Sequence, residues 1–304
     1  RRPPRSTLSS SSAASDVYKR QGDMRVAQRA TSASMSNAGN TYDVCDRWSY
    51  NRNGVTATVA QVAEAPAGSG FTKSLKFTTT SELGSISAGN MLSFSYRIET
   101  QDVKKLAYGT SDAKTATISF WARGSLSGKI GVNCARDSRT FSAGVDIVAN
   151  TWKFVEIVIP ADTSTAFSGA DTAAGFDVAI RAAAGSNFTS GPTGGSWISF
   201  HTAYAAGFTA GQQGAYLTTI GSTFQITGVQ LEIGSQSTSF DFRYYGDQLK
   251  MCQRYYAILH PTTQAQIYIE SGGTATHSFW AVSYTHLRAH ETGRNLVCRL
   301  LLEK

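Results

Sequence analysis

The sequence has few of the residues that carry catalysis or hold metal ions. Its 304 residues include four cysteines and five histidines, and these show no CxxC, HxxH or HExxH spacing. It also lacks a GxSxG motif between a strand and a helix, which a serine nucleophile of the hydrolase type would need. We therefore expect no enzyme activity, no catalytic residue, and no metal ion or other cofactor.

Carboxylates are not arranged as a glycosidase would need them. Such an enzyme requires two carboxylates that converge in one cleft. Asp162, Asp171 and Asp177 are close in sequence, but each lies in or beside a predicted turn, where aspartate is favoured because its side chain bonds the local backbone. We interpret these three residues as structural, which favours a binding function over a catalytic one.

Cysteine is too sparse to predict a disulfide framework. Cys45, Cys134 and Cys252 lie far apart in the sequence. Isolated cysteines of this kind are typical of small buried side chains in a protein that folds in a reducing compartment. The alternative is a disulfide between Cys45 and Cys134, which the sequence permits but does not favour.

Charge is low, at 16% of residues, and its distribution argues against a nucleic-acid partner. The formal net charge is +7, but much of it lies at the two ends of the chain. Residues 1–21 hold five basic residues and one acidic residue, and residues 282–304 hold four basic and two acidic residues. The residues between them are close to neutral, without the basic surface that phosphate binding requires. No stretch approaches the roughly 18 consecutive apolar residues of a spanning helix, so we expect no membrane insertion.

Glycine, serine, threonine and alanine are abundant, and aromatic residues reach 11%, which is typical of an all-β protein with many turns. We expect a jelly-roll β-sandwich of two antiparallel sheets, with eight to ten strands before a closing strand. Alternation and composition predict these strands near Val55–Val59, Leu75–Phe77, Leu92–Ile98, Ile118–Ala122, Gly128–Cys134, Trp152–Ile159, Phe176–Ala182, Ser196–His201 and Ala215–Ile220.

The clearest alternation lies in Leu92–Ile98, where every second residue is apolar and the residues between them are Ser93, Ser95 and Arg97. Burial of four such side chains contributes about 1.5 to 3 kcal/mol each, so this strand should be central. The segment Thr100–Leu106, next in the chain, is predicted to be a short helix with Thr100 as its N-cap.

The closing strand is predicted at Thr223–Ile233, where apolar and polar residues again alternate. In Tyr245–Ile258 the apolar residues recur at three- and four-residue steps, which indicates an amphipathic helix. Strands at Gln264–Glu270 and Thr274–Trp280 would begin a second β domain, which two strands cannot sustain alone. We expect that a chain ending before Tyr244 keeps a folded sandwich.

Short blocks of sequence carry a resemblance to a known family. They are GDMRVAQR from Gly22, the DRW of Asp46–Trp48, GVQLEIG over Gly228–Gly234, YGDQL from Tyr245 and CQRYY from Cys252. Together they resemble tail-fibre proteins of tailed phages, in which a jelly roll similar to carbohydrate-binding modules precedes a distal domain. SFWARG, TWKFVEIVIPADTS and ITGVQLEIG also follow one another in the order of such jelly rolls.

The resemblance implies a virion component of the phage tail, folded in the bacterial host cytoplasm, that binds host cell-surface glycans. It also implies a homotrimer in contact with other tail proteins, in which Tyr255 and Tyr256 pack against a neighbouring subunit or the distal domain. Two alternatives stay open. One is a carbohydrate-binding module of a polysaccharide-degrading enzyme, and the other is a structural spacer without a ligand.

The two ends differ in character from the rest. The first 21 residues and the last 23 resemble peptides that arise when sequencing-adapter DNA is read as coding sequence. We therefore expect residues 1–21 and 282–304 to be non-native tails. The alternative for residues 1–21 is a disordered basic segment. The expected boundaries between them are a linker over 22–42, the jelly-roll domain over 43–234, a helical connector over 235–260 and the start of a truncated distal β domain over 261–281.

Glycan recognition on a β-sandwich uses aromatic faces against the apolar side of a sugar ring and planar polar groups for its hydroxyls. Two sets of residues fit this chemistry. The first set is expected to point outward from a single sheet and consists of Arg97, Trp121 and Arg123. The second lies in the long loop region and consists of Trp197, Tyr204 and Tyr216. The alternative for Trp121 is that it covers the second face of its sheet or forms a subunit contact.

Overall fold

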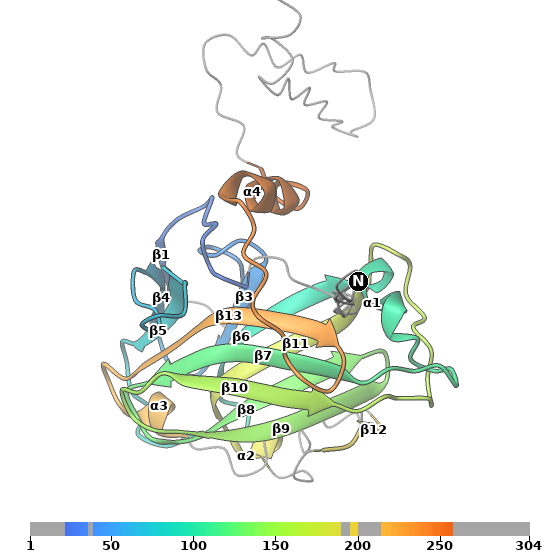
Figure 1. The fold of residues 1–304 in the computed structure, drawn as a ribbon. Helices are drawn as coiled ribbons and strands as arrows, with labels where there is room; N and C mark the ends of the chain where they lie inside the picture. Colours follow the sequence, from blue (N-terminus) through green and yellow to red (C-terminus); the bar gives the residue numbers. More distant parts are fainter. Residues whose placement is uncertain (1–21, 36–38, 190–194, 200–213, 258–304) are drawn as a thin grey trace, which may run out of the picture. The chain divides into compact units, whose positions relative to one another are not determined.

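The computed structural model describes residues 22–35, 39–189, 195–199 and 214–257, which form one sandwich of two antiparallel sheets (Figure 1). Among these residues the first sheet has six strands, in the order β1-β4-β5-β13-β7-β10. Their bounds are Ser32–Met35, Ala57–Val62, Ser74–Thr79, Thr223–Ile233, Ala116–Gly124 and Lys153–Ile159.

The second sheet has seven strands within the same described ranges, in the order β12-β9-β8-β11-β6-β3-β2. Their bounds are Ile198–Ser199, Arg139–Ile147, Gly128–Arg136, Ala174–Ala184, Met91–Glu99, Trp48–Asn53 and Gly39–Thr41. Consecutive strands repeatedly change sheet, as in a jelly roll, and the predicted fold class is confirmed.

The core lies between the sheets and follows the predicted alternation. Phe94 of β6 stacks on Phe77 of β5 with ring centroids 3.9 Å apart, and Phe224 of β13 lies 6.1 Å from Phe94. All three are buried. Stacked aromatic side chains bury large apolar areas, so this contact between opposed sheets is a main source of stability.

The closing strand β13 matches its predicted bounds and pairs with β5 on one side and β7 on the other. Its register shifts between Thr227 and Gln230. Gly228 lies at this bulge with φ +65°, and a Cβ there would meet the ring of Phe71 at 2.5 Å. The first glycine of GVQLEIG is therefore required both by the backbone conformation and by the close approach of Phe71.

Several local predictions differ from the structure. Ala215–Ile220 is not a strand, because Ala215–Thr218 forms the single helical turn α3 with Tyr216 and Leu217 buried beneath it. β9 is a long strand absent from the predicted set, although Phe141, Ala143, Val145 and Ile147 alternate with polar or small residues along it. The helix at Thr100 is split into α1, Thr100–Val103, and the 3-10 turn η1, Lys104–Leu106.

The N-cap of α1 is Glu99 rather than Thr100, and no side chain caps it. The Thr100 hydroxyl instead donates to the carbonyl of Ala173 at 3.3 Å. A further short helix, α2, spans Ser186–Thr189. None of the helices in the described ranges is long and apolar enough to cross a membrane.

The segment predicted as a linker, 22–42, is part of the sandwich where it is described. Met24 and Val26 are buried, and β1 pairs with β4 at one end of the first sheet. Alternation is weak here because the strand is short and lies at an edge. The physical boundary of the domain is therefore earlier than Asp43.

The predicted connector helix is α4, Tyr245–Gln253, which ends earlier than the sequence pattern suggests. Its buried Gln248 donates to Asp23 at 2.8 Å, and Arg254 just beyond it donates to Glu99 at 2.8 Å. The connector thus packs on the described part of its own chain. The distal domain predicted over 261–281 and both expected tails lie outside the described residues.

Candidate functional site

The outward residues predicted as one set lie on two different sheets. Arg97 is on β6 of the seven-stranded sheet, whereas Trp121 and Arg123 are on β7 of the six-stranded sheet. Sequence alternation gives the direction of a side chain relative to its own strand but not the sheet to which the strand belongs. Arg97 therefore does not act together with Trp121.

Two residues of the predicted loop set lie in the core. Trp197 is 8% exposed, and its indole Nε1 donates to the carbonyl of Pro160 at 2.8 Å. Tyr216 is 0% exposed, and its hydroxyl donates to the carbonyl of Leu126 at 2.9 Å. These aromatic rings fill the sandwich rather than face solvent. Tyr204 lies outside the described residues.

We expect Tyr216→Phe to lower stability without altering ligand binding. The substitution removes the donor to the Leu126 carbonyl from a partly buried hydrogen bond, which costs about 1 to 2 kcal/mol. Denaturant unfolding measures this loss. A glycan affinity that falls in the folded variant would contradict the assignment of Tyr216 to the core.

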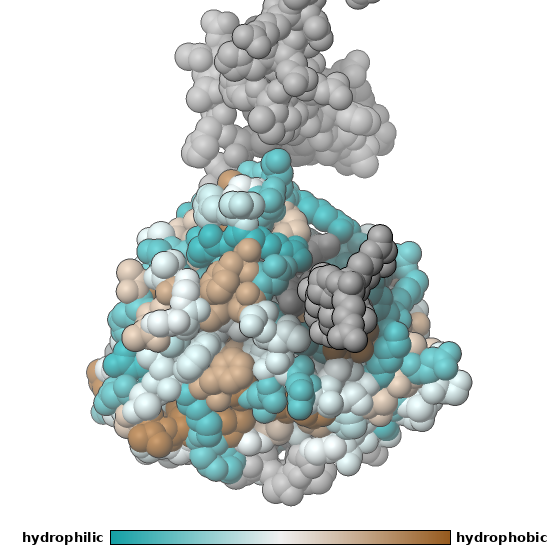
Figure 2. Space-filling model, viewed as in Figure 1, coloured by the Kyte–Doolittle hydropathy of each residue, from teal (hydrophilic) through white to brown (hydrophobic). Residues whose placement is uncertain are grey.

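The exposed aromatic residues of the six-stranded sheet form a different and more compact group. Trp121 on β7 lies directly opposite Phe154 on β10, and their ring centroids are 5.3 Å apart. Phe154 is 44% exposed and Trp121 is partly buried. Figure 2 views this face and shows hydrophobic patches separated by hydrophilic side chains.

Polar side chains on neighbouring strands lie on the same side of the sheet as this aromatic pair. Arg123 on β7 lies opposite Gln225 on β13, and Gln225 lies opposite Lys76 on β5. Glu64, just beyond β4, accepts from Lys76 at 2.9 Å and from Gln225 at 3.2 Å, and it pairs with Arg123 at 3.4 Å. Gln225 is only 3% exposed, so it supports Glu64 from below and is not itself available to a ligand. We call the other three polar residues, together with Trp121 and Phe154, the Trp121 surface.

The Trp121 surface offers both donors and acceptors beside the aromatic rings. The hydrogen bond from Lys76 outweighs partial burial and lowers the pKa of Glu64, with smaller contributions from Gln225 and Arg123. Glu64 is therefore ionised at neutral pH and accepts hydrogen bonds. Sequence reasoning missed Glu64, Lys76, Phe154 and Gln225, because only the strand pairing brings them to Trp121.

A cavity of about 260 Å³ lies beside the C-terminal end of α4. It is lined by Arg29, Tyr42, Asp46, Arg47, Arg97, Cys252, Tyr255 and Tyr256. It therefore brings Arg97 together with the two tyrosines expected at a subunit contact. Both tyrosines are partly buried against their own chain, which is a contact that the sequence could not indicate. We call this feature the arginine cavity.

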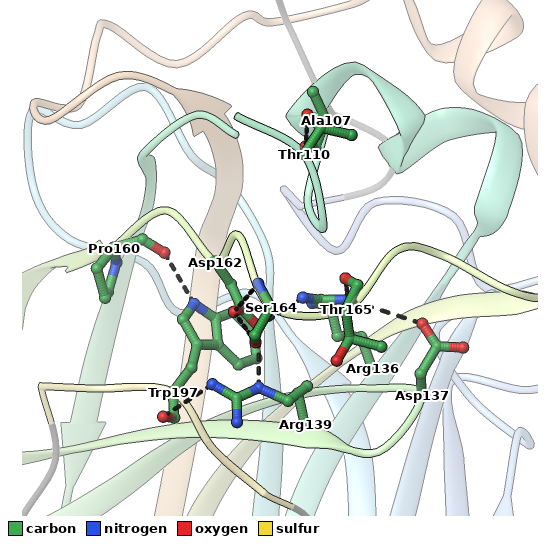
Figure 3. Close-up of polar contacts among 10 residues, drawn as sticks. All are labelled: Ala107, Thr110, Arg136, Asp137, Arg139, Pro160, Asp162, Ser164, Thr165 and Trp197. Carbon is green, nitrogen blue, oxygen red and sulfur yellow. Dashed lines mark hydrogen bonds and ion pairs between the residues drawn. The ribbon is translucent and has the colours of Figure 1, made fainter. Parts of the chain in front are cut away.

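A third polar group is buried and structural (Figure 3). The Arg136 side chain is 0% exposed and pairs with Asp162, which also accepts from Arg139 at 3.1 Å. The guanidinium of Arg136 lies within 5.4 Å of the ring centroids of Tyr108, Phe167 and Trp197. This group ties the loop after β10 to the end of the hairpin β8–β9.

The three aspartates interpreted as structural do not converge. Asp162 pairs with Arg136, while Asp171 pairs with Lys104 and Asp177 lies 3.4 Å from Arg97. Across the described ranges no group of three histidine, cysteine, aspartate or glutamate residues could hold a metal ion. Cys45, Cys134 and Cys252 are buried, as the sequence predicts.

No model of a protein family matches this chain, and no curated protein matches it in sequence. Solved structures with a similar arrangement include the enzymatically active domain of tailspike protein 4 of bacteriophage CBA120, with a TM-score of 0.33 and 12% identity. The match covers 62% of this chain, which spans only 19% of that chain.

Two carbohydrate-binding modules are also similar. The family 11 module of a Clostridium thermocellum cellulosomal cellulase has a TM-score of 0.32 and 12% identity, over 67% of this chain and 99% of that one. The xylan-binding domain of Paenibacillus barcinonensis Xyn10C has a TM-score of 0.31 and 12% identity, over 68% and 94%. Scores this low carry no argument about what this chain binds.

Proposed function

We propose that this chain is a non-catalytic, glycan-binding segment of a phage tail fibre. The observation that carries the proposal is the Trp121 surface, where the partly exposed Trp121 and the exposed Phe154 lie on the same side of the sheet as a network of arginine, lysine and glutamate side chains. Aromatic rings pack against the apolar face of a pyranose, and planar polar groups bind its hydroxyls.

We expect weak binding by a single copy of this surface. A shallow contact with one or two sugar units corresponds to a Kd of about 1 mM, or about 4 kcal/mol. A tail fibre compensates by presenting several copies to one cell surface, which raises the apparent affinity by about a hundredfold or more. The homotrimer and the location in the virion, which the resemblance to tail fibres implies, would supply these copies.

We expect Trp121→Ala to abolish detectable glycan binding while the fold is kept. Loss of one stacking ring removes about 1 to 3 kcal/mol, most of the energy available to a millimolar contact. A glycan array that carries the wild-type chain and the variant side by side measures this. Tyr244→Ala is the matched control, because Tyr244 is an aromatic residue 86% exposed outside the Trp121 surface.

An array without signal for the wild-type chain would contradict glycan binding and favour the spacer alternative. If Trp121→Ala still binds the glycan, the binding site lies outside the Trp121 surface. Light scattering on the full chain tests the trimer independently. A monomeric mass would contradict the proposed trimer but not the proposed glycan binding.

The Trp121 surface would serve equally well in a carbohydrate-binding module of a polysaccharide-degrading enzyme. A catalytic domain encoded in the same reading frame would establish that alternative. Incubation of any array ligand with the chain distinguishes binding from turnover. We expect the ligand to be recovered intact, and shortened oligosaccharides would contradict the non-catalytic role.

A further inference from the structure

Three phenylalanine rings gather where the chain leaves the sandwich after β13. Phe240 and Phe242 both pack against Phe71, which precedes β5, with ring centroids 4.8 and 5.0 Å from it. Phe240 and Phe242 lie 5.0 Å from each other. Phe242 is 49% exposed, whereas the other two rings are partly buried. This phenylalanine triad therefore presents one aromatic ring to solvent, supported by the other two.

Glycines fix the position of the triad. The Phe71 ring rests on Gly228 at the bulge of β13, and the Phe242 ring rests on Gly70, where a Cβ would lie 3.0 Å from it. Gly70 has φ +82°, a conformation that glycine adopts without strain. A ring that is held in this way loses little entropy when a ligand packs on it, which favours binding.

The triad lies on the same side of the six-stranded sheet as the Trp121 surface. Trp121 lies opposite Thr227 on β13, and residues directly opposed on antiparallel strands point to the same side of the sheet. The Thr227 hydroxyl donates to the carbonyl of Lys73 at 2.7 Å, so the segment between Phe71 and β5 covers that side. Across the strands, the aromatic side chains thus follow one another from Phe154 to Trp121 and then to the triad.

The loop after β13 runs beside this line of rings (Figure 1). The backbone N–H of Ser237 donates at 2.9 Å to Glu156, which points to the same side of β10 as Phe154. The next residue, Thr238, donates through its backbone N–H at 2.8 Å to Glu232 on β13. The loop therefore crosses from β10 to β13 before Phe240 joins the triad. Its hydroxyl side chains place hydrogen-bonding groups along one flank of the line.

From this arrangement we propose that Phe242 is a second sugar platform, and that the site takes a linear oligosaccharide lying across the strands from Phe154 past Trp121 to Phe242. This inference rests on the proposed glycan-binding function and deepens it. Two steps between neighbouring strands, about 10 Å in all, separate β10 from β13. A single sugar ring cannot contact both ends of such a line, so the ligand is a chain of several units.

The test compares two fragments of the linear polysaccharide that gives the strongest array signal, a disaccharide and a hexasaccharide prepared by partial hydrolysis. We expect the wild-type full chain to bind the hexasaccharide about tenfold more tightly or better, because one further aromatic contact contributes about this factor. Phe242→Ala should remove most of that preference by weakening hexasaccharide binding alone. Phe242→Tyr keeps a ring and should keep the preference.

Tyr245→Ala is the matched control, because Tyr245 is 51% exposed and lies three residues beyond Phe242 but outside the triad. It should keep the preference for the hexasaccharide. A longer chain also offers more registers to a short site, and the preference that remains in Phe242→Ala measures this contribution. Equal affinity of the wild-type chain for both fragments, or a preference that Phe242→Ala leaves intact, would overturn the inference.

Two further outcomes would also overturn it. One is an array on which the chain binds only branched glycans or single sugars. The other is a lower molar mass of Phe242→Ala in light scattering together with an unchanged preference for the hexasaccharide, which would assign the ring to a contact between copies of the chain.

These outcomes are separable from the proposed function. Disaccharide binding that depends on Trp121, without any gain for the hexasaccharide, keeps the proposed function and removes only the second platform. Hexasaccharide binding that depends on Phe242 but is unaffected by Trp121→Ala keeps Phe242 as a sugar contact and removes the Trp121 surface.

Discussion

Substitution Asp162→Asn should lower the free energy of unfolding by about 3 to 5 kcal/mol, as loss of one partner of a buried ion pair does. The variant removes the negative charge but keeps the size of the side chain. Arg136, fully buried among aromatic rings, would then keep its hydrogen bond to the Thr165 carbonyl but lose the nearer of its two carboxylates, leaving only Asp137 at 3.8 Å. Urea unfolding measures the change.

Asp171→Asn provides the comparison for an exposed pair. Asp171 and Lys104 both have side chains that are more than half exposed, so this variant should lose less than about 1 kcal/mol. If Asp162→Asn is no more destabilising than Asp171→Asn, the Arg136 group does not hold the loop after β10 in place.

The ion pair between Asp162 and Arg136 also makes the free energy of unfolding depend on pH. Burial raises the pKa of Asp162, but hydrogen bonds from Ser164 and Arg139 and the charge of Arg136 outweigh it and lower the pKa to about 2 from an ordinary 3.8. A carboxyl with a lowered folded-state pKa contributes its full stabilisation above about pH 4 and loses it as the pH falls towards 2. Asp162→Asn should flatten this part of the curve of unfolding free energy against pH.

A chain that ends at Arg243 should remain folded but be less stable, by about 3 to 5 kcal/mol, than a chain that ends at Ala257. The shorter chain loses the bonds from Gln248 to Asp23, from Gln28 to the Tyr256 carbonyl and from Arg254 to Glu99, each of which contributes about 1 kcal/mol. The rings beneath Arg29 and Arg47 are lost with them.

The chain that ends at Ala257 is the control for this truncation, because it keeps α4 and both tyrosines and lacks only residues 258–304. Equal unfolding midpoints for the two chains would contradict the assignment of α4 to the sandwich. The sequence alone predicts a separable connector, and the structure changes that expectation because α4 has its main partners in the first residues of the domain.

Alternation identifies the elements that carry their own pattern. β13 and β7 are predictable from the sequence because buried strands impose period two on their residues. α3 is not, since a single helical turn has no detectable period. β9 does carry period two, at Phe141, Ala143, Val145 and Ile147, and was within reach of the same reasoning. Expected elements outside the described residues stay predictions.

The candidate site was partly predictable for a related reason. Trp121 and Arg123 stand out in sequence because they are large side chains on the outward side of a patterned strand. Trp197 and Tyr216 are large aromatic residues too, but both are buried, Tyr216 within the helical turn α3, and no local pattern shows that burial. Glu64 and Phe154 reach the site only through strand pairing, which no local pattern shows.

The proposed glycan binding depends most on Trp121, and an NMR titration of the indole N–H signals tests it directly. With the best array ligand added to the full chain, we predict that the Trp121 indole signal, assigned with Trp121→Phe, shifts progressively. The signal of Trp197, whose indole N–H is bonded to Pro160, should stay in place. A ligand that binds without moving the Trp121 signal, or that moves the Trp197 signal instead, would contradict the proposed function.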